Sequence, residues 1–161
     1  MQIANYTSKD EQDVINLILP IQQIEFGVPV TINDQPDLLD VANVYCKGKG
    51  NFWVARENGN LVGTIALIDF GNKKAALRKM FVHKDYRGKD KAVAQALLKI
   101  LLSWCRKHGI SEIYLGTVEQ LHAAKRFYEK NGFVRIAKTE LPDDFPLMKV
   151  DTEFFKLKIA E

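Results

Sequence analysis

The clearest hydrophobic pattern in the chain begins at Val93. Apolar residues recur from there at the spacing of one helix face, and Gly109 follows the last of them. Such a stripe is typical of an amphipathic helix that packs on a core, and glycine is common just beyond a helix end. The pattern predicts a helix from Val93 that ends at Gly109. Its apolar face comprises Ala96, Leu97, Ile100, Leu101, Trp104 and Cys105.

Three strands are predicted before this helix. The apolar runs 52–56 and 61–68 flank Asn58-Gly59, the residue pair that a type I′ hairpin turn requires. Residues 71–73 then turn the chain into a third strand over residues 75–82. We therefore expect an antiparallel meander in the middle of the chain.

Beyond residue 109 the spacing of the apolar residues alternates between that of a strand and that of a helix. Residues 113–118 are predicted to form a strand, and residues 120–130 a helix with Asn131-Gly132 as its left-handed C-cap. Closing strands are predicted at 133–138 and 152–158, around a proline-containing loop at 141–150.

The N-terminal part is predicted to be more irregular. A short strand at 3–6 precedes Ser8-x-x-Glu11, which has the form of a helix capping box. The helix that follows should end or kink at Pro20. Residues 25–36 contain Gly27 and two prolines and favour a loop, and Asp37 is a candidate cap for a second helix.

This order of elements predicts the fold class. Helices come first, then a three-strand meander whose last strand leads into a helix, a strand, a second helix and two strands. The 161 residues suit a single domain over 1–161, because this length allows one hydrophobic core. We expect an α+β domain with a mixed, mostly antiparallel central sheet flanked by helices.

A basic turn between the strand at 77–82 and the helix at Val93 is a candidate anion site. The free N–H groups of a first helical turn point outward, and the helix dipole favours negative charge there. Small residues let a ligand approach the backbone, and cations lie close by. The turn therefore predicts phosphate binding. Its residues are Arg87, Gly88, Lys89, Asp90, Lys91, Ala92, Val93 and Ala94.

Three segments together resemble the GNAT superfamily of acetyl-CoA-dependent N-acetyltransferases. Residues 77–82 (LRKMFV) are similar to its central strand, and Lys89-x-x-Ala92-x-Ala94 to its pyrophosphate motif. Residues 127–133 (FYEKNGF) are similar to the helix end that closes its acceptor side. The resemblance extends over roughly residues 1 to 140. It implies the GNAT fold, in which the cofactor wedges between two splayed strands, and acetyl-CoA as cosubstrate.

The resemblance also implies which residues hold the cofactor. Backbone groups at Phe81 and Val82 would pair with the pantetheine arm, as an added strand would. The loop 87–94 would bind the pyrophosphate, and Lys125 is a further phosphate contact. Two positions depart from the family, since Lys89 stands for glutamine or arginine and Ala92 for glycine. Alanine at residue 92 is expected to fit a helical backbone.

Tyr128 is the catalytic residue that the resemblance implies most directly. The family's tyrosine at this position lies near the thioester sulfur and can protonate the departing thiolate. The alternative is a core tyrosine whose ring only packs. Leu121 stands where the family commonly has an asparagine, so Thr117 or Gln120 would have to replace that polar contact.

The general base is less defined by the sequence. Ala76 occupies the strand position where some family members have a glutamate. Glu119 is the predicted substitute, with Glu25 and Asp69 as alternatives. Each could equally be a solvated surface carboxylate, and a water chain or a neutral amine would need no base.

Charge and composition exclude several classes of partner. A net charge of +3 does not favour a nucleic-acid partner, and no apolar run approaches a membrane span. Cys46 and Cys105 lack metal-ligand spacing, the histidines have no clustered partners, and the N-terminus does not resemble a secretory signal. We expect a cytoplasmic protein without a metal, and a C-terminal edge strand that would allow homodimer formation.

The sequence thus predicts an N-acetyltransferase that moves the acetyl group directly to a primary amine in a ternary complex. The acceptor would be a small-molecule or peptide amine. Acidic residues at Glu25, Asp34, Asp37, Asp143 and Asp144 would suit a cationic acceptor. The alternative function is a non-catalytic module that binds or senses acyl-CoA.

Overall fold

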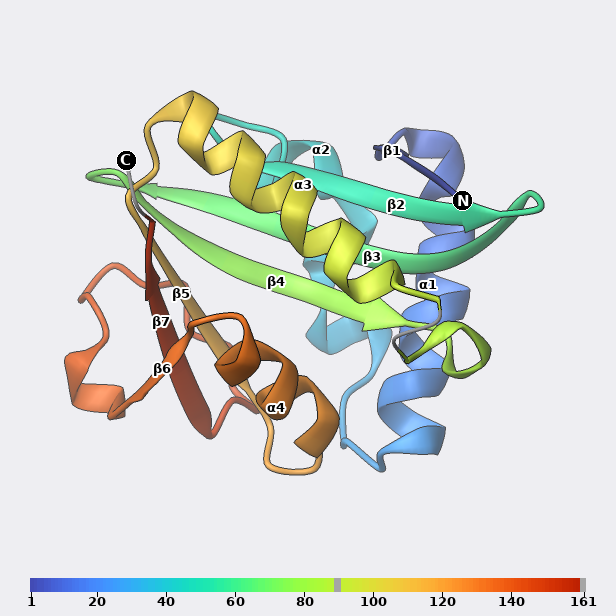
Figure 1. Cartoon of the computed structure of the whole chain (residues 1–161). Coiled ribbons are helices and arrows are strands. Elements are labelled where there is room, and N and C mark those ends of the chain that lie inside the picture. The colour runs from blue at the N-terminus through green and yellow to red at the C-terminus, as the bar shows by residue number, and fades with distance from the viewer. Residues whose placement is uncertain (89–90, 160–161) are drawn as a thin grey trace.

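The computed structural model describes residues 1–88 and 91–159. Within them, seven strands form one sheet in the order β1-β2-β3-β4-β5-β7-β6 (Figure 1). The strands are β1 (Gln2–Asn5), β2 (Asn51–Glu57), β3 (Asn60–Gly71), β4 (Lys74–Val82), β5 (Glu112–Thr117), β6 (Val134–Ile136) and β7 (Glu153–Lys158). The helices are α1 (Glu11–Pro20), α2 (Val41–Val44), α3 (Val93–His108) and α4 (His122–Lys130).

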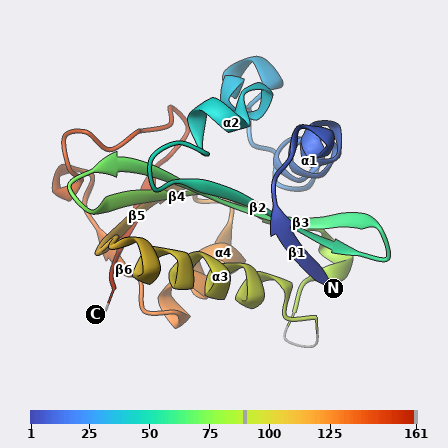
Figure 2. The same ribbon diagram turned by 90° about the horizontal axis from the view of Figure 1, so that it is seen from above.

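The helices cover both faces of the sheet. Figure 2 shows α3 and α4 on one face and α1 and α2 on the other. The larger core lies between α3 and the sheet and includes Trp53, Leu67 and Leu77. A second core, around Phe52 and Tyr45, lies under α1 and α2. No helix in the described part of the chain is both long and apolar enough to cross a membrane.

The predicted α+β class and mixed sheet are confirmed. Neighbouring strands pair antiparallel throughout, except for the parallel pair β4 and β5. The Asn58-Gly59 hairpin is also confirmed, because both residues have positive φ, 51° and 83°, as a type I′ turn requires. α3 ends at Gly109, which is left-handed with φ 74°.

The N-terminal cap differs from the prediction. The capping box consists of Thr7 and Asp10 rather than Ser8 and Glu11, and the Thr7 N–H donates to Asp10 Oδ2 at 2.8 Å. A 3₁₀ turn at Ser8–Asp10 therefore precedes α1. Arg56 of β2 holds the same carboxylate at 2.7 Å, which fixes this turn on the sheet.

The segment after α1 also differs in part. Pro20 ends the α-helical pattern as predicted, but the chain continues as a π-helical turn over Ile21–Glu25. Asp37 does not cap a helix. It lies in a 3₁₀ turn, Pro36–Leu39, and its buried carboxylate accepts a 2.6 Å hydrogen bond from the Tyr45 hydroxyl. The cap prediction was wrong because Asp37 is used inside the core.

The C-terminal strand is not a sheet edge. β7 lies between β5 and β6, so the edge strands among the described residues are β1 and the short β6. The predicted strand at 133–138 is shortened to Val134–Ile136, because a 3₁₀ turn occupies Lys138–Glu140. Homodimer formation through an edge strand stays a prediction.

The parallel pair β4 and β5 separates after a few residues. Only Lys74–Ala76 of β4 pair with Glu112–Tyr114 of β5. Beyond these residues the two strands diverge, as Figure 1 shows. The edge of β4 that faces β5 therefore has no strand partner from Leu77 to Val82 within the described residues. This split is the feature that positions the candidate site.

Candidate active site

A cavity occupies the split between β4 and β5. We call it the split cavity. Its lining side chains come from both faces of the sheet. The lining comprises residues 77–81 of β4, residues 116–118 at the end of β5, Leu121 and Tyr128 from the α4 region, and Gln22, Val28, Val30, Gln35, Met148, Val150 and Asp151 from the N-terminal segment and the last loop.

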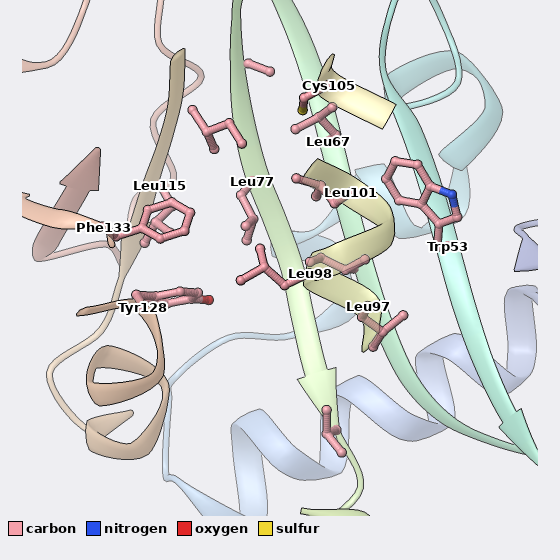
Figure 3. Close-up of a cluster of buried hydrophobic side chains, with 14 of the residues drawn as sticks. Trp53, Leu67, Leu77, Leu97, Leu98, Leu101, Cys105, Leu115, Tyr128 and Phe133 are labelled. Atoms are coloured by element: carbon pink, nitrogen blue, oxygen red, sulfur yellow. The ribbon is translucent and has the colours of Figure 1, made fainter. Parts of the chain in front are cut away.

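Tyr128 reaches the split cavity from the face covered by α3 and α4. Its ring packs against Phe133 and Phe155, with ring centroids 5.6 and 6.0 Å apart. Figure 3 shows it extending from α4 toward β4, with the hydroxyl at its leading end. Burial, and secondarily the charge of Asp151, raise its pKa well above the usual value. Tyr128 therefore keeps its proton at neutral pH and can act as a donor.

A β-bulge in β4 shapes the opposite wall of the split cavity. Thr64 pairs with Phe81 and Ala66 pairs with Arg78, so Lys79 and Met80 together face the single residue between Thr64 and Ala66. Lys79 is left-handed, with φ 52°, and the Thr64 hydroxyl donates to its carbonyl at 2.7 Å. A bulge of this kind redirects side chains and interrupts the ladder.

The bulge turns Lys79 toward the face covered by α1 and α2. Leu77 and Met80 contact the core under α3, whereas the Lys79 ammonium binds Gln35 and lies 3.5 Å from Asp37. Burial lowers the pKa of Lys79 to about 8, and Asp37 partly opposes that shift. Lys79 is thus a buried cation with its partners supplied by the chain.

Asp151 is a candidate functional residue that the sequence analysis missed. It lines the split cavity and lies directly against Gly116 of β5, where an added Cβ would be 2.5 Å from Asp151 Oδ2. Burial raises its pKa to about 6, against the opposing charges of Arg78 and Lys79. The glycine inside a predicted strand was the available signal, because such a glycine often marks a close approach.

The predicted phosphate loop is described only in part. Lys89 and Asp90 lie outside the described residues. Ala92 precedes the first residue of α3 and is left-handed, with φ 54° and ψ 22°. The expectation that alanine would be helical here was wrong. The chain turns into α3 at this residue, in a conformation that glycine adopts without strain.

Replacing Ala92 with glycine should stabilise the fold. A left-handed alanine costs about 1–2 kcal/mol, and glycine loses about 0.5–1 kcal/mol of that gain through unfolded-state entropy. We expect a net gain of about 0.5–1 kcal/mol in urea unfolding. The matched control is Ala96→Gly inside α3, which should destabilise by about 1 kcal/mol. Equal losses in both variants would contradict a left-handed Ala92.

Arg87, predicted to contact phosphate, has partners within the chain. Its Nε donates to the Val82 carbonyl at 2.8 Å, and its guanidinium binds the Glu25 carboxylate, with one contact at 2.9 Å. It also lies over the Phe26 ring. These contacts tie the loop to the end of the N-terminal helix, and they occupy Glu25, one of the alternative bases.

The other loop residues contribute mainly backbone. Val93 is buried in the core and Ala94 packs against it. Gly88 has φ 103°, and the Lys91 ammonium lies over the Tyr86 ring. Lys125 forms a 2.7 Å ion pair with Glu153, in which both side chains are largely buried. A phosphate role for Lys125 would require it to leave that partner.

The carboxylates predicted as bases are placed away from the split cavity. Asp69 accepts from the Lys49 and Gly71 backbone at the far end of β3. Glu119 follows β5 but is exposed and is not among the lining residues. Ala76 is fully buried beside Tyr114 and Phe145, so no acidic group occupies that strand position. Asp151 lines the split cavity and is a further candidate base, and the role of Glu119 stays a prediction.

Comparison with known proteins identifies the family of this fold. Residues 16–133 match the acetyltransferase (GNAT) family. A GNAT-family acetyltransferase structure from Staphylococcus aureus Mu50 is 38% identical, with a TM-score of 0.95 over 99% of each chain. A Salmonella typhimurium acetyltransferase structure that contains acetyl-CoA has a TM-score of 0.71, over 100% of this chain and 95% of that one. At 19% identity it shows likeness of fold alone.

The curated relatives are longer proteins. N-acetyltransferase family 8 member 2 of Rattus norvegicus is 32% identical over 104 residues, which are 62% of this chain and 45% of the relative. The chain thus spans less than half the length of that relative.

Proposed function

Because this chain belongs to the GNAT acetyltransferase family, we propose that it transfers an acetyl group from acetyl-CoA directly to a primary amine. The observation that carries the proposal is the split cavity. It joins Tyr128, on the face of α3 and α4, to Asp151, which lies against the other face at Gly116. A donor and an acceptor of protons therefore approach one cavity from opposite sides of the sheet.

The residues present fit acetyl-CoA as cosubstrate. The edge of β4 that faces β5 lacks a strand partner from Leu77 to Val82, so backbone groups on this edge are available to an extended ligand. The start of α3 at Val93 and Ala94 would receive phosphate through free N–H groups and the helix dipole. The Val82 carbonyl already accepts from Arg87, so a pantetheine contact at that carbonyl would share it with Arg87 or displace Arg87. The cosubstrate supplies the acetyl group as a thioester.

The two titratable groups divide the proton transfers. Asp151 would accept a proton from the bound ammonium, which frees the nitrogen lone pair for attack on the thioester carbonyl. The new C–N bond forms as the C–S bond breaks, Tyr128 would give its proton to the departing sulfur, and the nitrogen would lose its second surplus proton to solvent. Tyr128 then regains a proton from solvent, and the overall reaction releases one proton.

A non-catalytic acyl-CoA-binding module remains the second candidate. Two observations favour it. Ala92 places a methyl group where the family has glycine, and Leu121 lines the split cavity where the family commonly has asparagine. Both would weaken or reposition the cosubstrate without removing the binding edge of β4. Such a module would bind acetyl-CoA but release no CoA in the presence of amines.

Calorimetry followed by an acceptor screen tests the proposal. The protein is titrated with acetyl-CoA and with CoA, and CoA thiol release is then measured across a panel of primary amines. We expect saturable binding and amine-dependent thiol release. Binding without release for any amine would favour the non-catalytic module. Absence of binding at millimolar acetyl-CoA would contradict both functions.

A further inference from the structure

Arg78 is the cation beside the split cavity that the chain leaves without a partner. Within the described residues it forms no ion pair or hydrogen bond, and its buried Nε has no acceptor. Its neighbour Lys79 differs, since Gln35 and Asp37 hold that ammonium. Arg78 is half-buried, and a buried polar atom normally has a hydrogen-bond partner, so its unsatisfied Nε points to an acceptor from outside the chain.

Arg78 lies where two cavities meet. Besides the split cavity, it lines an adjoining cavity, shared with Met148 and bordered by Asp34, Asp37, Asp40 and Lys149. Arg78 and Asp151 both line the split cavity. An acceptor whose nitrogen faces Asp151 could therefore place another of its groups beside Arg78.

The acidic residues of the adjoining cavity are already engaged. Asp37 accepts from Tyr45, Asp34 from the Thr31 N–H at 3.0 Å, and Asp40 from the Asn43 amide at 2.8 Å. Each of these carboxylates thus has a donor within the chain, whereas the Arg78 Nε has no acceptor. An anionic group on the acceptor finds a free donor in Arg78. The hydrogen-bonding group that the chain leaves unsatisfied here is thus a donor, which an anionic group of the acceptor would satisfy.

We propose that Arg78 binds a carboxylate of the acceptor, which makes the acceptor an amino acid or a conjugate with its carboxylate free. The proposal rests on the function proposed above. A guanidinium can bind a carboxylate through two parallel hydrogen bonds, which fixes orientation as well as charge. Arg78 would hold the carboxylate while Asp151 receives the ammonium proton.

Matched acceptors test the carboxylate directly. CoA release is measured with the standard α-amino acids, with their α-carboxamides and with spermidine. We expect kcat/KM for the preferred amino acid to exceed that for its carboxamide by about 10- to 100-fold. Equal use of the two, or a preference for spermidine, would overturn the carboxylate assignment and leave acetyl transfer intact.

Variants of Arg78 then test whether this residue binds the carboxylate. Arg78→Met should raise the acceptor KM about 10- to 100-fold and remove the preference over the carboxamide, whereas Arg78→Lys should retain part of it. The control is Arg106→Met, an exposed arginine at the end of α3. Unchanged acetyl-CoA affinity by calorimetry would show that each variant is folded.

A binding measurement that needs no turnover separates the carboxylate assignment from the proposed acetyl transfer. The N-acetylated product is titrated into the CoA complex of the wild type and of Arg78→Met. Binding that is lost in Arg78→Met but retained in Arg106→Met supports the assignment. Equal binding to both variants overturns it. Failure of the wild type to bind acetyl-CoA or to acetylate any amine would overturn the proposed function and this assignment together.

Discussion

Tyr128→Phe is expected to lower kcat about 10²- to 10⁴-fold while the affinity for acetyl-CoA barely changes. The substitution removes only the hydroxyl, which has no hydrogen-bond partner among the described residues and faces the split cavity. The ring contacts with Phe133 and Phe155 remain, so the fold should be unaffected. Steady-state kinetics and calorimetry with acetyl-CoA measure the two quantities separately.

The matched control for this prediction is Tyr114→Phe. The Tyr114 hydroxyl binds Glu112 at 2.6 Å on the opposite face of the sheet and does not line the split cavity. Its loss should leave kcat within about twofold, since the Tyr114 hydroxyl lies outside the split cavity. Normal turnover in Tyr128→Phe would assign Tyr128 to the core alone. A loss confined to acetyl-CoA affinity would make it a binding residue.

The sequence pattern predicted those elements that depend on backbone preferences within a few residues. The helical spacing from Val93 to Gly109 and the Asn58-Gly59 turn both correspond to observed elements. Each signal depends on backbone preferences within a few residues, which a sequence displays directly. The position of Tyr128 at the split followed from the family resemblance, because an aromatic residue on a helix face is otherwise typical of a core.

Contacts between distant segments could not be predicted in this way. Arg87 and Glu25 are 62 positions apart, and Lys79 and Gln35 are 44 apart, so no local pattern links them. The bulge that turns Lys79 over has no glycine to announce it. Asp37 looked like a cap because its partner Tyr45 becomes a neighbour only after folding. The site therefore depended on tertiary packing that the sequence pattern does not display.

Asp151→Asn is expected to lower kcat/KM about 10²- to 10³-fold at about pH 8 and to remove a break in the pH profile. A base must be deprotonated to act, and the pKa of Asp151 is about 6. In the wild type, kcat/KM should therefore rise about tenfold per pH unit below that value and level off above it. Asparagine cannot accept the proton, so the rise near pH 6 should disappear. Rates measured from about pH 5 to pH 9 test this.

Two further variants separate chemistry from structure at Asp151. Asp144→Asn changes an exposed aspartate of the same loop and should retain both the rate and the break. Gly116→Ala keeps the Asp151 carboxylate but displaces it, because the added Cβ would lie 2.5 Å from Oδ2. It should lower kcat/KM while a pH break persists at a shifted value, since a carboxylate remains. A break near pH 6 that survives in Asp151→Asn would assign the base to another group or to water.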